Sequence, residues 1–269
     1  MSKVAVVEFE EYGSSVRRAL DLIGAAEVLA QQERIMLKPN VINSSPHPIT
    51  THPDCVEAVI EYCRECSLAE IVVGEGCGER DTMDAFEMLG FCEVARRQDV
   101  RLVDLESEPE ITLTQPGAKF LPEFHMPRIL EDVFLIGVPV LKAHSMAQVT
   151  LGLKNMIGVC PARHYGGSHY RKSKLHCSNN SELHEAIVEL NKYRKADLVL
   201  MDATVGMAEA HIWGPECDPH VNKIVAGFDV VAVDAVGCDL LGRNWRKIKH
   251  VRLADGELGD AQNVELLSG

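Results

Sequence analysis

The segment RIMLKPN, residues 34–40, is a short apolar run that ends in a lysine, a proline and an asparagine. It is followed by THPDCVEAVIEYCREC, residues 51–66, where apolar residues recur every three or four positions, and then by a second apolar run, EIVVGEG, residues 70–76. The three- to four-residue period predicts an amphipathic helix, and the short apolar runs bounded by turn residues predict buried strands. The order strand, helix, strand therefore predicts an α/β fold with a mostly parallel sheet.

The same alternation continues along the chain, which predicts repeated βα units with helices flanking the sheet. We expect Ser14 or Ser15 to begin the first helix, residues 51–53 (THP) the second, and Asp229 the last. Because α/β folds of this length commonly form one domain, we expect one domain over residues 1–269. The expected strands are residues 4–8, 34–37, 70–73, 101–105, 133–138, 198–201 and 224–226, and the expected helices are residues 15–30, 53–65, 82–89, 181–193 and 230–241.

The composition is that of an ordinary globular protein of 269 residues, with 46% hydrophobic and 25% charged residues. Its formal net charge of −13 argues against a nucleic-acid-binding surface, because phosphate binding needs clustered lysine and arginine. The apolar runs are too short to span a bilayer, and the N-terminal MSKVAVVEFE lacks the features of a signal peptide. We therefore expect a cytoplasmic protein without membrane or nucleic-acid partners, whose nine cysteines are mostly reduced thiols.

Polar residues directly follow several expected strands. Lys38 and Asn40 flank Pro39, which lacks an amide hydrogen and should end its strand, and Glu75 stands in a glycine-rich turn after the next strand. Ligands of open α/β sheets bind at the carboxyl ends of the strands, so these are candidate ligand-binding residues. A surface turn is an equally good interpretation of Lys38 and Asn40, and a tight βα turn explains the glycines almost as well.

A second polar group follows the apolar run at residues 133–138 and contains Lys142, His144, Lys154 and Asn155. A buried lysine needs an anion, and a desolvated lysine can act as a base or nucleophile. Histidine is the commonest general acid or base. We therefore expect Lys142, His144 and Lys154 to be catalytic and Asn155 to bind ligand. The alternative for Lys154 is a salt bridge on an amphipathic helix.

Two aspartates in the last third of the chain are further candidates. Asp202 directly follows an expected strand, and Asp234 interrupts the apolar face of an expected helix. A buried carboxylate needs a partner, so each can orient a lysine of the site. For Asp234, capping of neighbouring backbone amides is an equally good interpretation.

The segment from residue 160 to residue 180 lacks clear periodicity and forms a basic stretch in an acidic chain. Long segments of this kind are usually functional or disordered, so we expect a basic lid loop over residues 159–180. Its cysteines and histidines also make a metal ion or an iron–sulfur cluster conceivable, although their spacing is not that of a ferredoxin. The candidate metal ligands are Cys160, His164, His169, Cys177 and Cys217.

Together these motifs resemble the prokaryotic family known as domain of unknown function 362. The resemblance covers nearly the whole chain and rests on residues 37–40 (LKPN), 50–53 (TTHP), 73–75 (VGE), 139–144 (PVLKAH), 153–158 (LKNMIG) and 227–234 (GFDVVAVD). It implies that Thr51 and His52, which lie in the second motif, belong to the ligand site. Many relatives carry an added ferredoxin-like iron–sulfur module, which this chain lacks. A weaker similarity, in which His144 precedes Lys154 by ten residues, is to the nickel-pincer lactate racemases.

Three functions fit these features. The first is an isomerase, lyase or transferase. It binds a small carboxylate- or phosphate-bearing ligand, and its lysine and histidine residues act on that ligand as acids and bases. The second is a metal- or iron–sulfur-binding protein that acts with a redox partner. The third is a non-catalytic module whose basic loop docks an acidic partner. The convergence of polar residues at strand ends favours the enzyme.

Overall fold

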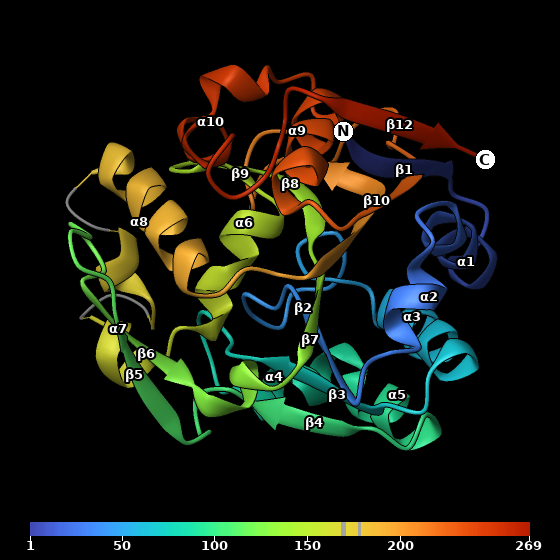
Figure 1. Cartoon of the computed structure of the whole chain (residues 1–269), viewed down its shortest axis with the longest axis horizontal. Coiled ribbons are helices and arrows are strands. Elements are labelled where there is room, and N and C mark those ends of the chain that lie inside the picture. Colours follow the sequence, from blue (N-terminus) through green and yellow to red (C-terminus); the bar gives the residue numbers. More distant parts are fainter. Residues whose placement is uncertain (168–170, 177–178) are drawn as a thin grey trace.

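The computed structural model describes residues 1–167, 171–176 and 179–269, and its strands form a ten-stranded sheet and a separate hairpin (Figure 1). Eight strands of the large sheet lie side by side in the order β12 (Val264–Ser268), β1 (Ser2–Glu8), β11 (Lys223–Gly227), β10 (Leu198–Met207), β7 (Phe134–Val138), β2 (Arg34–Pro39), β3 (Glu70–Glu75) and β4 (Arg101–Asp104). The other two strands are β8 (Val140–His144), which pairs with β10, and β9 (Gln148–Thr150), which pairs with β8.

The sheet is mostly parallel, as predicted. Strands β7, β2, β3 and β4 run in one direction, and β10 is parallel to both β7 and β8. The antiparallel pairs are β1 with β11, β11 with β10, and β8 with β9. Because β2, β3 and β7 are parallel neighbours, the loops that follow them meet at one edge of the sheet.

Helices cover both faces of the sheet, and each face has its own hydrophobic core. Strand β2 contributes to both, since Met36 faces one core while Ile35 and Leu37 face the other, in the alternation of a strand buried on both sides. One face packs against α1 (Tyr12–Leu22), α2 (Ala25–Leu29), α3 (Pro53–Cys66), α4 (Thr82–Leu89) and α5 (Phe91–Arg97). The other face packs against α6 (Gly152–Asn155), α8 (Asn180–Tyr193), α9 (Val230–Leu240) and α10 (Lys249–Ala254).

Two of the three expected helix starts are confirmed. His52 accepts a hydrogen bond from the amide of Asp54 at the start of α3, and Asp229 accepts from two amides at the start of α9. The expected serine cap of α1 is wrong, because this helix begins at Tyr12 and the Ser15 hydroxyl instead accepts from the amide of Glu10. The single helix expected over residues 15–30 is interrupted at Gly24, whose φ of 70° is left-handed.

Several elements were not expected from the sequence. Strand β10 continues to Met207, beyond the end predicted at residue 201, and its second half pairs with β8. The segment expected as a basic lid loop contains two short helices, α7 (Ala162–Tyr165) and η3 (Ser173–His176). The described residues include no helix of the length and apolar character that crossing a membrane requires. The other unpredicted elements include α5, α6, α10, β8, β9 and β12, whose bounds are given above. They also include β5 (Glu110–Thr114), β6 (Glu123–Pro127), η1 (Arg128–Glu131), η2 (Met156–Val159) and η4 (Trp245–Lys247).

Candidate functional site

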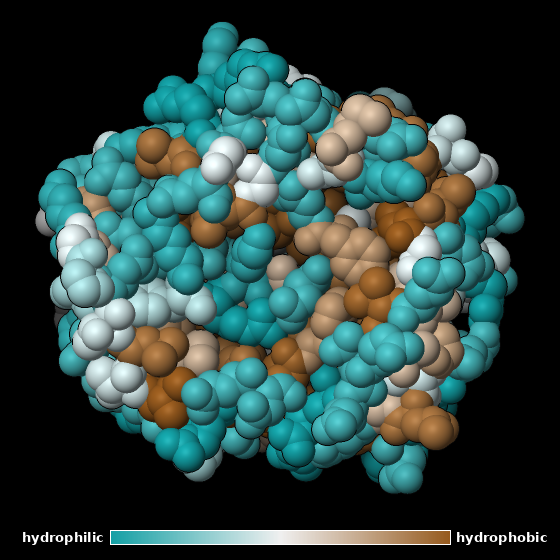
Figure 2. Space-filling view, viewed as in Figure 1, coloured by the Kyte–Doolittle hydropathy of each residue, from teal (hydrophilic) through white to brown (hydrophobic). Residues whose placement is uncertain are grey.

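A cavity of about 270 Å³ lies at the carboxyl ends of β2, β3 and β8. Figure 2 shows a hollow near the centre of this face of the molecule, over the region where β2, β8 and α6 lie in Figure 1. Six of the site residues predicted from the sequence line this cavity: Asn40, Glu75, Lys142, His144, Lys154 and Asn155. Its other polar lining residues are Glu79, Thr150, Lys172 and His211.

A buried ion pair between Lys38 and Glu75 lies beside the cavity. The Lys38 Nζ donates to Glu75 Oε2 at 2.5 Å, and the exposed fractions of the two side chains are 0% and 2%. Burial raises the pKa of Glu75 to about 7 and lowers the pKa of Lys38, while the direct contact between them opposes both shifts. Glu75 lines the cavity, whereas Lys38 is not among the lining residues.

Gly158 packs directly against this ion pair. A Cβ at this position would overlap Glu75 Oε1 and lie 2.6 Å from Lys38 Nζ. We therefore expect Gly158→Ala to lower the free energy of unfolding, measured in urea, by about 1–3 kcal/mol, as overpacking a buried site does. Gly13→Ala is the control, because a Cβ there meets no atom within 4 Å. An equally stable Gly158→Ala variant would contradict the expectation.

Asn155 connects the ion pair to Asn40. Its Oδ1 accepts from Lys38 Nζ at 3.2 Å and from Asn40 Nδ2 at 3.1 Å, and its Nδ2 donates to the Lys38 carbonyl. Thr51 holds the backbone of Asn40, since its hydroxyl accepts from the Asn40 amide and donates to the Val138 carbonyl. Thr51 is thus a positioning residue. Within the described chain, the buried Oδ1 of Asn40 has no hydrogen-bond partner, so it remains available to a ligand.

Lys142 and Lys154 bring two amines to the cavity. Both side chains are buried, and this burial lowers the pKa of Lys142 to about 7 and that of Lys154 to about 8. The nearby positive charge of Lys154 lowers the pKa of Lys142 further. Lys142 Nζ donates to the Ile49 carbonyl at 2.5 Å, and for Lys154 Nζ the described residues provide no hydrogen bond or ion pair. The salt-bridge alternative for Lys154 is therefore not realised among those residues.

Asp234 holds the short helix that carries Lys154. Its two carboxylate oxygens accept from the amides of Gly152 and Leu153, at 2.7 and 3.0 Å, at the start of α6. Burial raises the pKa of Asp234 to about 7, against the effect of these two hydrogen bonds. Asp234 thus caps backbone amides, which is one of the two interpretations expected from the sequence. The residue does not line the cavity.

The hydrogen bonds of His144 define the tautomer of its ring. Its Nδ1 accepts from the amides of Met146 and Ala147, at 3.0 and 3.1 Å, so its hydrogen is on Nε2. The ring stacks on His211, with the ring centres 3.8 Å apart and the planes 11° apart. Both rings line the cavity, which places an N–H donor near the two lysines.

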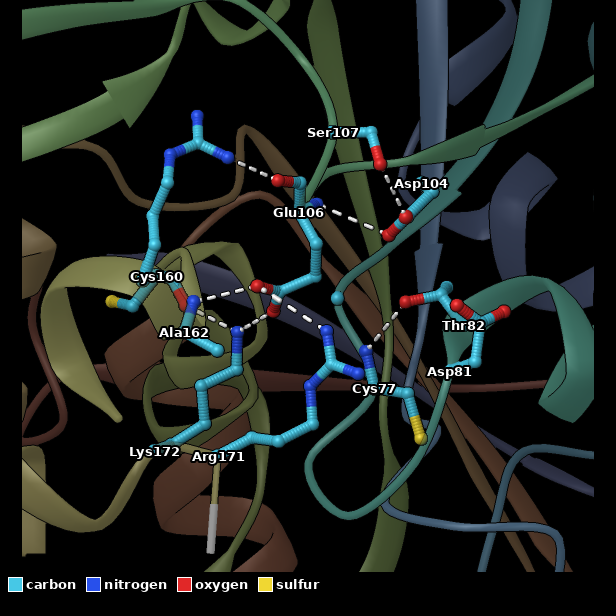
Figure 3. Close-up of polar contacts among 12 residues, drawn as sticks. Cys77, Asp81, Thr82, Asp104, Glu106, Ser107, Cys160, Ala162, Arg171 and Lys172 are labelled. Atoms are coloured by element: carbon cyan, nitrogen blue, oxygen red, sulfur yellow. Dashed lines mark hydrogen bonds and ion pairs between the residues drawn. The ribbon is translucent and has the colours of Figure 1, made fainter. Parts of the chain in front are cut away.

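Glu106 organises a second part of the cavity wall and was not predicted from the sequence. Figure 3 shows its carboxylate between Lys172 and Arg171, with the amide of Ala162 donating to Oε2 at 2.6 Å. Lys172 also donates to the Cys160 carbonyl. The sequence pattern that identified Glu75 also applies to Glu106, because Glu106 follows the carboxyl end of β4. The rule that ligands bind at strand ends therefore applied to it as well.

Asp202 and His52 lie in a separate polar cluster. Asp202 accepts from the Tyr12 hydroxyl at 3.0 Å and from the amide and hydroxyl of Thr204, and lies 3.3 Å from His47 Nε2. Burial alone would raise the pKa of Asp202, but the contacts with His47 and Thr204 lower it below its usual value. The His52 ring stacks on Tyr12. Neither residue lines the cavity, so the structure does not bring these two predicted ligand residues to it.

The candidate metal ligands that the structure describes, Cys160, His164 and Cys217, do not form a group with one another. Cys160 is buried, which raises the pKa of its thiol to about 12, and Cys217 lies beyond β10 with its amide bonded to the Gly206 carbonyl. His169 and Cys177 lie outside the described residues. His164 contacts a carboxylate on β5, and the only metal-compatible group in the described parts of the chain is His164 with Glu110 and His125.

Comparison with known proteins places the chain in a family. Residues 35–239 match the family model described as Domain of unknown function (DUF362). The chain belongs to this family. The DUF362 match begins in β2 and ends in α9, so it includes every strand and helix that brings a residue to the cavity. The thylakoid-associated protein sll1697 of Synechocystis sp. is 24% identical over 239 residues, which cover 85% of this chain and 69% of that protein.

The comparisons confirm the expected DUF362 membership. They do not show the weaker similarity to nickel-pincer lactate racemases.

Proposed function

We propose that this DUF362 protein is an enzyme that binds a small carboxylate- or phosphate-bearing molecule in the cavity. The observation that carries the proposal is the presence of two buried cavity lysines, Lys142 and Lys154. No carboxylate among the described residues forms an ion pair with either of them, whereas Lys38 has Glu75. Because an unpaired charge is costly to bury, an anionic ligand would stabilise the protonated lysines.

The rest of the cavity supports a small polar ligand. Its volume of about 270 Å³ is at the lower end of the range for small-molecule sites. Within the described residues, the buried hydroxyl of Thr150 and the Oδ1 of Asn40 have no hydrogen-bond partners. These atoms would bind polar groups of the ligand while the lysines bind its anionic group.

Lysine and histidine acid–base chemistry follows from the same geometry. A pKa of about 8 leaves about one tenth of Lys154 neutral at pH 7, far more than for an ordinary lysine, and a neutral amine can accept a proton or attack a carbonyl carbon. His144 Nε2 carries a hydrogen that it can donate to a developing oxyanion. We assign Lys142 and protonated Lys154 as the anion-binding residues, the neutral form of Lys154 as base or nucleophile and His144 as acid, in an isomerase, lyase or transferase.

Thermal unfolding with sulfate, phosphate, oxalate and pyruvate tests ligand binding, since an anion that binds the folded state raises Tm. We expect Lys154→Met to weaken anion binding by about 10- to 100-fold, because a hydrogen bond to a charged group contributes about 1.5–3 kcal/mol. Lys3→Met is the matched control, since it removes an exposed lysine from β1. Equal stabilisation of wild type and Lys154→Met, with both variants folded, would contradict the proposal.

The cytoplasmic location and the redox partner stay predictions. The relative from Synechocystis is named for its association with thylakoids, so fractionation of cells that express the present chain should include the membrane pellet. The alternative of a metal- or cluster-dependent redox protein predicts stoichiometric iron in protein purified without oxygen.

A further inference from the structure

A second group of polar side chains lies on the β5–β6 hairpin and does not line the cavity. Glu110 on β5, His125 on β6 and His164 on α7 each offer one ligand atom, and these atoms lie within 4.8 Å of one another. We infer that these three residues bind a divalent metal ion of the Zn²⁺ type. This site is independent of the proposed anion cavity.

Strand pairing and the docking of α7 bring the three side chains together. Glu110 and Thr112 are two positions apart on β5 and therefore face the same side, and His125 is the register partner of Thr112 on β6. Helix α7 packs against β6, because the Tyr165 hydroxyl accepts from the His125 amide at 3.0 Å. The rings of His125 and His164 are stacked, with centres 3.8 Å apart.

Each histidine of the group lies beside a carboxylate. His164 Nε2 lies 2.8 Å from Glu110 Oε2, and His125 Nε2 lies 3.1 Å from Glu123 Oε1. At such distances each ring nitrogen either donates a hydrogen to the carboxylate or shares a metal ion with it. Glu110 also contacts a guanidinium, since Arg163 Nη2 lies 2.6 Å from Glu110 Oε1, whereas the one ion pair of Glu123 among the described residues is with His125. The remaining negative charge favours a divalent cation.

The ligand types indicate which ion fits. Two imidazole nitrogens and one carboxylate oxygen suit Zn²⁺, whose bonds to such ligands are about 2.0–2.2 Å long. Tetrahedral ligand atoms are then roughly 3.4 Å apart, so small side-chain rotations close the group. The Thr112 hydroxyl lies 3.2 Å from His125 Nδ1, and by accepting its hydrogen it would leave Nε2 as the metal ligand. Three protein ligands leave a fourth position for water.

Such an ion would attach α7 to the hairpin and so stabilise one wall of the cavity. The first residue of α7, Ala162, donates its amide to Glu106, and Glu106 pairs with Lys172, which lines the cavity. The ion would therefore act as a structural cross-link.

Calorimetric titration of EDTA-treated protein with Zn²⁺ tests this inference. We expect one tight site per chain, and a rise in Tm of about 5–10 °C at a zinc concentration of 100 times Kd. His164→Ala and His125→Ala should each weaken binding by roughly 100-fold or more. Both histidines are only partly buried, so the Tm of each variant in EDTA should stay close to that of wild type.

Two other histidine variants serve as controls. His220→Ala removes an exposed histidine that lies beside Glu216, and His211→Ala removes a histidine that lines the cavity. Unchanged zinc binding in both controls supports the site. Loss of the tight site in either control would assign the ion elsewhere and overturn the inference. Wild-type binding in His164→Ala and His125→Ala, or no stoichiometric binding in wild type, would overturn it as well.

Discussion

Glu75→Leu should lower the free energy of unfolding by about 3–5 kcal/mol, because it leaves the Lys38 ammonium buried without its counter-ion. Lys38 is fully buried, and its other hydrogen bonds go to the Pro39 carbonyl and to Asn155 Oδ1, which do not neutralise its charge. Urea denaturation at neutral pH measures the change. Lys38→Met should cost a similar amount, since it leaves the Glu75 carboxylate unpaired.

The chain contains a matched control for this ion pair. Arg34 and Glu70 join the same two strands, β2 and β3, at their opposite ends, with Nε and Oε2 2.9 Å apart. This pair is exposed, so Glu70→Leu should cost less than about 1 kcal/mol. The double variant Lys38→Met/Glu75→Leu removes both buried charges and should be more stable than either single variant. Equal losses for Glu75→Leu and Glu70→Leu would contradict this account.

The strand-end residues of the site could be predicted because their signal is local. Pro39 ends β2 and Gly76 follows β3, and the parallel order of these strands then brings Asn40 and Glu75 to one cavity. The partners of Thr51 and Asp234 could not be predicted in this way. Their partners are backbone groups distant in sequence, such as the amide of Gly152 for Asp234, and periodicity carries no information about such contacts.

The missed hairpin shows a different reason for failure. Strand β5 has the sequence EITLT, and its alternation of polar and apolar residues is the signal of a half-buried strand. The prediction relied on continuous apolar runs, which identify fully buried strands such as β2 and β7 but not an exposed hairpin. Without β5 and β6, Glu110 and His125 could not be recognised as neighbours of His164, so the candidate zinc site was visible in the sequence only as one isolated histidine.

Sulfate binding in the cavity should weaken about 1000-fold between pH 6 and pH 9, measured by calorimetry. Sulfate stays a dianion over this range, so a change in its affinity reflects a change in the protonation of the protein. The pKa of Lys142 is about 7 and that of Lys154 about 8, so both amines are protonated at pH 6 and mostly neutral at pH 9. Only the protonated amines attract the anion, so affinity is full below these pKa values and is lost as the pH rises through them.

The size of the effect follows from linkage. Two pH units above its pKa, Lys142 contributes a loss of about 100-fold, and one unit above its pKa, Lys154 contributes about 10-fold. Glu75 acts in the same direction, because its pKa of about 7 makes it anionic and repulsive at high pH. An affinity that is constant from pH 6 to pH 9, or that rises with pH, would show that the lysines do not hold the anion.

The two single lysine variants separate the contributions. Lys142→Met should retain only the roughly 10-fold loss that belongs to Lys154. Lys154→Met should retain the larger loss that belongs to Lys142, but at higher pH, because the positive charge of Lys154 contributes to the lowered pKa of Lys142. The quantity to compare is the pH at which sulfate affinity begins to fall. A higher value in Lys154→Met would show that both amines share one cavity, and an unchanged value would show that they act apart.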